Sequence, residues 1–201
     1  MSDAQHREWL HQVAMRDKGS AAAMAQLYKA LCGAVFAFVR QRLYDADDHA
    51  IQSVVVDTLH EVWRAAERFS GQSQVKTWVL GIARHKLLDV VRSDAQRGPH
   101  EDIDDHAETL ADEGPELSER LSQQQRAQWL QWCMEKLPVE QRESLHLLFV
   151  EGQGVEQIAQ VLGVPSGTVK TRVFHAKRKL KDCLARWLKH DEAGPALADP
   201  A

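Results

Sequence analysis

Two short helical patterns near the carboxyl end, Val155–Leu162 and Pro165–Leu184, are separated by only two residues, and this spacing constrains the fold more than any other feature of the chain. So tight a connection between two periodic segments predicts a helix-turn-helix. Three residue types fit it for steric reasons. Ala159 keeps the two helix axes close, Gly163 permits the positive φ that a short turn often requires, and Val169 fills the space between the helices.

The second of these helices is basic on its outer side. No acidic residue occurs between Pro165 and Lys181, and a projection at 100° per residue places an apolar stripe inward. Any single lysine on such a helix is ordinarily interpreted as part of a solvated face. The helix-turn-helix frame favours DNA contacts instead. In that geometry the helix reads base edges in the major groove, and flanking Lys and Arg side chains bind phosphates. Base reading is assigned to Lys170, Thr171, Phe174 and His175, and phosphate contacts to Arg172, Lys177 and Arg178.

The amino-terminal part of the chain is also expected to be helical. Helical periodicity with little strand alternation runs from Arg7 to Arg92 and is interrupted by the loop Ser70–Ser73. Apolar stripes predict one helix over about Ala46–Phe69 and another over about Val75–Arg92. In the second helix one arc carries Val75, Val79, Ile82, Ala83, Leu87 and Val90. The opposite arc carries Thr77, Arg84, His85, Asp89 and Arg92, with Trp78 at its margin and Leu88 in its middle.

Charge divides the chain into three parts. Residues 1–92 carry 12 Lys and Arg against 10 Asp and Glu, residues 93–123 carry 2 against 10, and residues 124–201 carry 11 against 9. The acidic middle part holds Gly98–Pro99 and Gly114–Pro115 and too few apolar residues for a core. The expected fold is therefore all-α, with two small helical domains, residues 1–92 and 121–190, joined by a flexible acidic linker over residues 93–120. Residues 191–201 are expected to form a disordered tail.

The cysteines and the amino terminus indicate a compartment. Cys32, Cys133 and Cys183 lie far apart with no CxxC or Cys/His spacing, which indicates neither a disulfide framework nor a zinc site and favours a reduced cytoplasm. Cys133 is expected to share an apolar face with Leu130 and Leu137. We find no signal-like amino terminus and no stretch of about 18 apolar residues, so we expect a soluble protein that is neither exported nor inserted into a membrane, with no metal and no cofactor.

Two segments resemble extracytoplasmic-function (ECF) sigma factors of the sigma-70 superfamily. In the carboxyl-terminal domain the resemblance rests on Leu137–Glu143, Ile158–Ala159, Leu162–Val164 and Gly167–Arg178. In the amino-terminal domain it rests on Phe69–Arg92, which resembles the segment that opens and reads the promoter. The resemblance implies a non-enzymatic factor that gives core RNA polymerase its promoter specificity, with polymerase and promoter DNA as partners.

The resemblance further implies a division of labour between the domains. The carboxyl-terminal domain would bind the minus-thirty-five element as duplex, and the amino-terminal domain would capture the non-template strand of the minus-ten element. Single-strand capture needs a basic groove and stacking surfaces, and Trp78 suits such a surface, although its angle also fits a half-buried core aromatic. The candidate residues for the minus-ten element are Ser70, Gly71, Gln72, Ser73, Trp78, Arg84, His85, Lys86 and Arg92.

A polymerase-binding helix is also implied by the resemblance, around Asp45–Trp63, where acidic and apolar residues would meet a coiled coil of the largest polymerase subunit. Ser53 and Val56 depart from the family pattern in this helix. His85 and His175 depart from it in the DNA-binding segments, and these two differences predict an unusual promoter preference. Family membership implies an anti-sigma factor as a further partner. The polymerase-binding candidates are Asp47, Asp48, Asp57 and Glu61.

Two other functions compete with this interpretation. A one-component or response-type regulator would have a similar helix-turn-helix and would bind DNA without polymerase, but the segment from Thr77 to Arg92 disfavours it. A nuclease would need a metal site at the acidic residues Glu101–Asp105, yet these lie between chain breakers in a segment without a core to hold ligands in place.

Overall fold

The computed structural model describes residues 2–43, 46–97 and 117–191, and every regular element within these ranges is a helix. The all-α prediction is confirmed. The elements are α1 (Asp3–Met15), α2 (Ser20–Arg40), α3 (Asp48–Ala65), the short 3-10 helix η1 (Ala66–Arg68), α4 (Val75–Arg97), α5 (Leu117–Glu135), α6 (Val139–Phe149), α7 (Val155–Leu162) and α8 (Ser166–Asp191).

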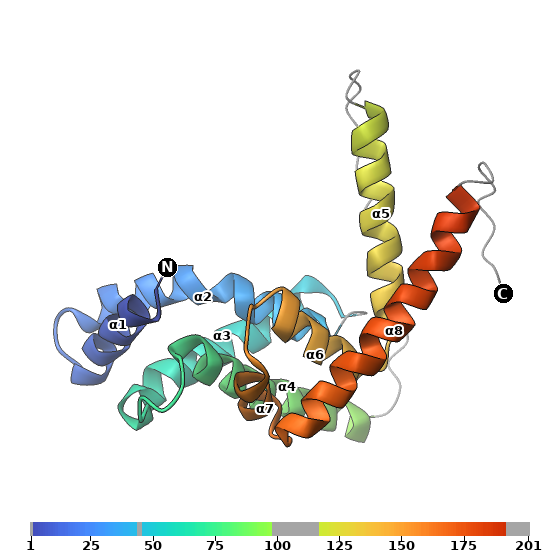
Figure 1. Ribbon diagram of the computed structural model, residues 1–201. Helices are drawn as coiled ribbons and strands as arrows, with labels where there is room; N and C mark the ends of the chain where they lie inside the picture. Colours follow the sequence, from blue (N-terminus) through green and yellow to red (C-terminus); the bar gives the residue numbers. More distant parts are fainter. Residues whose placement is uncertain (1, 44–45, 98–116, 192–201) are drawn as a thin grey trace.

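Helices α1 to α4 form the amino-terminal half of the molecule (Figure 1). Helix α2 packs against α1, α3 and α4, and its fully buried side chains include Leu27, Leu31 and Phe38. Asp47 is the N-cap of α3: its carboxylate accepts a hydrogen bond from the backbone N–H of Ala50 at 2.7 Å. The apolar stripe predicted for α3 is buried along its length.

Helices α5 to α8 form the carboxyl-terminal half. The core of this half consists of apolar side chains from α6, α7 and α8, among them Leu147, Ile158 and Val169, each with none of its surface exposed. Helix α5 and the carboxyl-terminal part of α8 project from this core and diverge toward their far ends (Figure 1).

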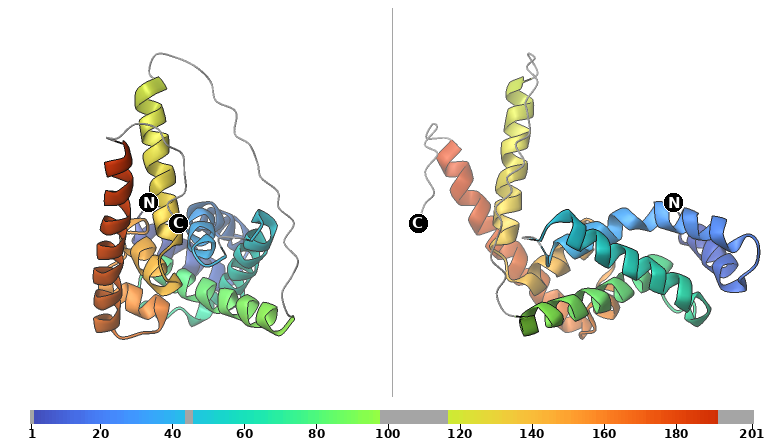
Figure 2. Two further views of the ribbon diagram at one scale, coloured as in Figure 1. Left: turned by 90° about the vertical axis from the view of Figure 1, so that its right-hand side faces the viewer. Right: turned by 180° about the vertical axis from the view of Figure 1, so that it is seen from behind.

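The two halves are in contact with each other. Helix α4 packs against α7, as the two views in Figure 2 show, and α2 also meets α6. Buried apolar residues of both halves belong to one continuous cluster, with Leu80 and Leu87 of α4 on one side and Val161 and Leu162 of α7 on the other. Each domain therefore covers part of the other.

The helix boundaries differ from the predicted ones. Helix α4 continues to Arg97 and α5 begins at Leu117, so both ends of the expected linker are helical, and α8 extends past Leu184. The predicted helix over Ala46–Phe69 is divided into α3 and η1. Three parts of the prediction lie outside the described residues: the chain breakers Gly98–Pro99 and Gly114–Pro115, the acidic run Glu101–Asp105, and the tail after Asp191.

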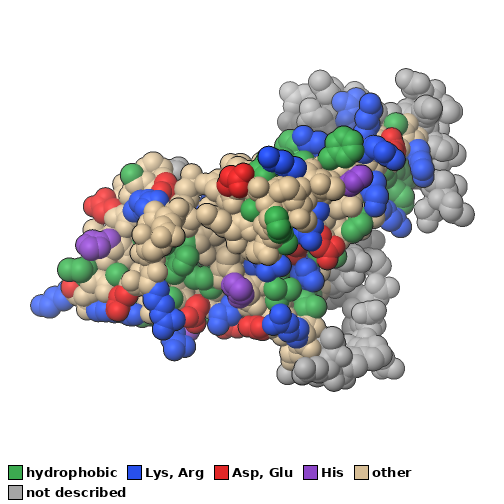
Figure 3. All heavy atoms as spheres, turned by 60° about the horizontal axis from the view of Figure 1, so that its bottom comes forward, with side chains coloured by type: hydrophobic (Ala, Val, Ile, Leu, Met, Phe, Trp, Pro, Cys, Tyr) green, Lys and Arg blue, Asp and Glu red, His purple; other side chains and the backbone are tan. Residues whose placement is uncertain are grey.

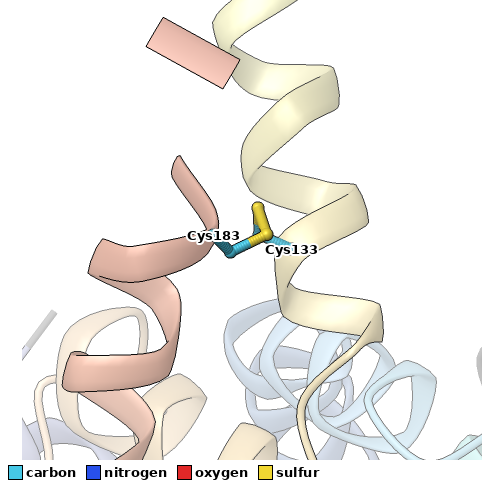
Figure 4. Close-up of a disulfide and its surroundings, with 2 residues drawn as sticks. All are labelled: Cys133 and Cys183. Atoms are coloured by element: carbon cyan, nitrogen blue, oxygen red, sulfur yellow. A yellow bond between two sulfur atoms is a disulfide. The ribbon is translucent and has the colours of Figure 1, made fainter. Parts of the chain in front are cut away.

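A disulfide joins α5 to α8, and the sequence-based expectation that the cysteines form none was wrong. Cys133 and Cys183 are 50 residues apart in sequence, but the fold places their Cα atoms 5.9 Å apart (Figure 4). No local spacing signals such a bond, because it depends on how two helices pack. Cys133 and Leu137 are buried as expected, whereas Leu130 is 44% exposed. Cys32 is a free thiol.

Among the described residues, one helix meets the length and composition of a membrane span. This helix is α2, with 21 residues and a mean hydropathy of 1.5 over its most apolar window. Its apolar side chains pack against α1, α3 and α4, so a core helix of the bundle explains the composition.

Candidate nucleic-acid interface

The turn between α7 and α8 has the predicted geometry. Gly163 has φ of +60°, and the backbone N–H of Val164 donates to the Ala159 carbonyl oxygen at 3.1 Å, which closes the end of α7. Val169 has none of its surface exposed and packs in the core formed with Ile158. The helix-turn-helix frame is therefore present, and it fixes which side of α8 faces outward.

The outer face of α8 is basic and open. Phe174 is 63% exposed and contacts the ring of His175 edge-on at 5.4 Å, and Lys177 lies 4.9 Å above the ring of Phe149. Figure 3 shows Lys and Arg side chains gathered over this helix, at the upper right of the view. Six of the seven residues predicted to face DNA are exposed on this helix: Lys170, Thr171, Phe174, His175, Lys177 and Arg178.

Arg172, the seventh residue, is half-buried. Its positive charge acts on Arg84 of the amino-terminal domain. Arg172 therefore differs from the other six residues, which are exposed.

The loop Ser70–Ser73 is exposed except at Ser73, which is half-buried. Gly71 has φ of +76°, a left-handed conformation that glycine adopts at little cost. Arg7 of α1 donates to the carbonyl oxygens of Gly71 and Ser73. This contribution of α1 was missed from the sequence, because Arg7 precedes the loop by more than 60 residues.

Helix α4 begins directly after this loop and presents several of the candidate residues. His85 and Arg92 are exposed, and Trp78 is half-buried with its ring 5.4 Å from that of Phe69. Trp78 therefore lies where its interpretation as a half-buried core aromatic placed it. Lys86 is not free, because its Nζ lies 3.6 Å from Glu61 Oε2 of α3.

Two residues of α4 that we expected on an outer arc lie in the contact with the carboxyl-terminal domain instead. Thr77 is 3% exposed, and its hydroxyl donates to the side chain of Gln153 at 2.8 Å. Arg84 is half-buried, and its Nε is buried without a hydrogen-bond partner among the described residues. Burial lowers the pKa of Arg84, and Arg42 and Arg172 act in the same direction, while Glu143 raises it.

The same contact contains two ion pairs between the domains. Lys76 Nζ lies 2.5 Å from Glu151 Oε2, and Arg42 Nη1 lies 3.2 Å from Glu143 Oε1. Only 3% of the Glu143 side chain is exposed, and burial raises the pKa of its carboxyl, although Arg42 opposes this. Hydrogen bonds between charged partners with little water around them hold the two halves in a defined orientation.

The four acidic candidates for polymerase binding have different surroundings. Asp47 caps α3, Asp48 forms an ion pair with Arg40, and Glu61 contacts Lys86. Asp57 is exposed, next to Val56, which is 56% exposed.

A groove between α2 and α3 adjoins these residues and was not anticipated from the sequence. Its walls are apolar, and both Val56 and Tyr28, which is 46% exposed, reach solvent. Exposed apolar side chains beside acidic ones are typical of a surface that binds another protein. The groove is lined by Tyr28, Cys32, Gly33, Phe36, Gln52, Val55 and Val56.

Comparison with known families gives two matches in the same order along the chain. Residues 27–97 match the model of sigma-70 region 2, and residues 127–180 match that of sigma-70 region 4. Among curated relatives, the ECF RNA polymerase sigma-E factors of Salmonella typhimurium and of Escherichia coli K12 are each 28% identical over 137 residues, which span 65% of this chain and 71% of the relative.

Two solved structures share the fold. CnrH in complex with the cytosolic domain of CnrY has a TM-score of 0.60 and 22% identity, with 90% of this chain and 98% of that chain covered. The sigma factor RpoE of Bartonella quintana, in complex with the anti-sigma factor NepR, has a TM-score of 0.58 and 23% identity, with 80% and 96% covered.

Proposed function

Because the chain belongs to the sigma-70 family and is an ECF sigma factor that directs transcription initiation, we propose a role for each surface described above. The carboxyl-terminal domain reads the minus-thirty-five element with α8. The amino-terminal domain captures the minus-ten strand with the loop Ser70–Ser73 and α4, and it binds core polymerase through α2 and α3. The role is non-enzymatic, since RNA synthesis belongs to the polymerase.

The exposed, acid-free face of α8 is the observation that carries the proposal. From Ser166 to Lys181 the helix has no carboxylate, and its base-reading candidates lie in the first three turns. An α-helix fits the major groove, where Thr and Phe can contact thymine methyl groups and Lys can bond to guanine. We therefore assign base reading to Lys170, Thr171, Phe174 and His175, and phosphate contacts to Lys177 and Arg178.

Capture of the minus-ten strand has support from the open part of α4. His85 and Arg92 are exposed on α4, and the Trp78 ring is partly accessible for stacking. Arg84 is in a different situation, because α7 covers it: the distance from its Nη1 to a Cβ placed on Gly163 is 3.9 Å. We infer that Arg84 reaches the strand only after α4 and α7 separate.

Polymerase binding is assigned to the groove between α2 and α3 together with Asp57. A helix of a coiled coil could bury Tyr28 and Val56 in such a groove while its basic residues meet the nearby carboxylate. The binding site includes an apolar part that the acidic candidates alone do not supply.

An anti-sigma factor is the third proposed partner. The two solved structures named above are complexes, one with an anti-sigma factor and one with the cytosolic domain of CnrY. A partner of this kind would cover the groove or the α8 face. We place the protein in the cytoplasm, where polymerase and promoters are found.

The test is initiation by sigma-free bacterial core polymerase on genomic promoter fragments, with start sites mapped for the wild-type chain. We expect new start sites that share two sequence elements. Arg178→Ala should reduce initiation about tenfold, as loss of a DNA contact does. Arg126→Ala removes the same side chain from an exposed site on α5 and should leave initiation unchanged.

The outcome also separates this function from a stand-alone regulator. A regulator of that class binds duplex DNA tightly by itself and produces no start sites with core polymerase. Tight binding by the chain alone, without core-dependent initiation, would overturn the proposal.

A further inference from the structure

The loop Ser70–Ser73 is held in place by a side chain from the first helix. Arg7 donates from Nη1 to the Gly71 carbonyl oxygen at 3.1 Å and from Nη2 to the Ser73 carbonyl oxygen at 2.7 Å. One guanidinium thus bonds to the backbone on both sides of Gln72. Gln72 itself stays exposed between the two anchored residues.

Asp3 connects the same arrangement to the start of α4. One oxygen of its carboxylate accepts from Arg7 Nε at 2.6 Å, and the other accepts from the backbone N–H of Val75 at 2.8 Å. An N–H in the first turn of a helix has no partner within that helix, so the carboxylate satisfies it. Asp3 and Arg7 therefore join the loop to the helix that carries Trp78.

The aromatic residue before the loop is part of the arrangement as well. The guanidinium carbon of Arg7 lies 5.4 Å above the ring of Phe69, and that ring lies 5.4 Å from the ring of Trp78. A Cβ placed on Gly71 would come within 3.3 Å of Arg7 Nη1, so loop and guanidinium fit closely. A substitution of Arg7 would therefore affect the loop in two ways, by removing the hydrogen bonds to the loop carbonyl oxygens and by removing the contact with Phe69.

From this geometry we propose that Arg7, held by Asp3, is a positioning residue for recognition of the minus-ten element. It keeps the loop in the shape in which Gln72 and its neighbours meet the displaced strand, and it contacts no base itself. Its charge is compensated by Asp3, and its three nitrogens are all engaged within the protein. The proposal rests on the proposed function of the loop. Without Arg7 the loop would have to be ordered when the strand binds, at a cost in conformational entropy.

Arg16, the C-cap residue that follows the same helix, provides a control. It donates to the Arg64 carbonyl oxygen at 3.2 Å, lies 3.5 Å from Glu67 Oε1 and covers the ring of Trp63 at 5.3 Å. Arg7 and Arg16 thus each contact carbonyl and carboxylate oxygens and cover one aromatic ring. Of the two, only Arg7 contacts the loop, so a purely stabilising role predicts no specific effect of Arg7 on minus-ten discrimination.

The experiment compares wild type, Arg7→Gln, Arg7→Lys and Arg16→Gln in initiation by core polymerase. The template is a promoter found with the wild-type chain, together with a set in which each base of both elements is changed singly. Arg7→Gln should reduce discrimination among minus-ten bases about tenfold and leave discrimination at the minus-thirty-five element unchanged. Arg7→Lys should be intermediate, because an ammonium group lacks the planar fork that bonds to both carbonyls.

Arg16→Gln should keep wild-type discrimination, and thermal unfolding of both glutamine variants measures how much stability each change costs. Unchanged discrimination in Arg7→Gln would overturn the positioning role, and so would an equal change in Arg16→Gln. Absence of core-dependent initiation by the wild-type chain would overturn the proposed function of the protein, and this role with it.

Discussion

His6 lies on the buried side of α1, with 8% of its surface exposed and its Nε2 unpaired among the described residues. Burial lowers the pKa of this imidazole below its ordinary value of 6.5; Lys76 acts in the same direction and Asp3 opposes it. A histidine with a lowered pKa binds its proton more readily in the unfolded chain. Protonation therefore favours unfolding.

We expect the free energy of unfolding to fall as the pH decreases from about 6.5 toward the lower pKa of the folded state. Urea unfolding at pH 7.5, 6.5 and 5.5 measures this slope. The His6→Gln variant should lose most of it, whereas His11→Gln, an exposed site on the same helix, should retain it. Equal slopes in wild type and His6→Gln would contradict the assignment.

The two glycines on either side of Val164–Ser166, Gly163 and Gly167, have opposite requirements. Gly163 has φ of +60°, while Gly167 lies in the first turn of α8 with open space around its Cβ position. Alanine at residue 163 should lower the free energy of unfolding by about 1 kcal/mol, because a left-handed conformation is unfavourable for a side chain. Alanine at residue 167 should raise it by about 0.4–1 kcal/mol. Chemical denaturation of both variants measures the two signs, and a loss at both positions would be inconsistent with this geometry.

At the scale of the helices, the carboxyl-terminal domain depends on how α5 is attached to α8. The disulfide between Cys133 and Cys183 links them next to a cluster of three tryptophans. The ring of Trp187 stacks on Trp129 at 5.7 Å and meets Trp132 edge-on at 5.4 Å. Disulfide and aromatic contacts together hold the part of α8 that extends beyond the helix-turn-helix.

Reduction of this disulfide should lower the free energy of unfolding by about 2–4 kcal/mol, since a covalent link restricts the unfolded chain. The measurement is thermal unfolding with and without dithiothreitol, followed by far-UV circular dichroism. A Cys133→Ala/Cys183→Ala variant should melt near the reduced wild type and be insensitive to dithiothreitol. Cys32→Ser, which keeps the disulfide, should respond to the reductant as wild type does. No response in the wild type would show that the link contributes nothing to stability.

At the scale of the whole molecule, the contact between the two domains decides which surfaces are available. It covers Thr77 and Arg84 of α4 and leaves the outer face of α8 open. Glu143 is central to it, because its buried carboxyl lies among the positive charges of Arg42 and Arg84.

A positive charge at residue 143 should separate the domains, because Glu143→Lys would place an ammonium group beside Arg42 and Arg84. Small-angle X-ray scattering of the free chain should then show a larger radius of gyration, with helix content by circular dichroism unchanged. Glu156→Lys makes the same change at an exposed site on α7 and should leave the radius unchanged. The milder Arg42→Ala should give a smaller increase. An equal radius in wild type and Glu143→Lys would contradict a contact held by this carboxylate.

Local periodicity was sufficient to predict the all-α class, the helix-turn-helix with its left-handed Gly163, and the exposed basic face of α8. These features depend on residues within a few positions of one another, whose spacing the chain itself shows. The positions of Arg84, the Cys133–Cys183 disulfide and the hold of Arg7 on the loop depend instead on helices that are far apart in sequence. A single sequence carries the side chains for such contacts but not the packing angles that pair them, and so these features became visible only once the helices were assembled.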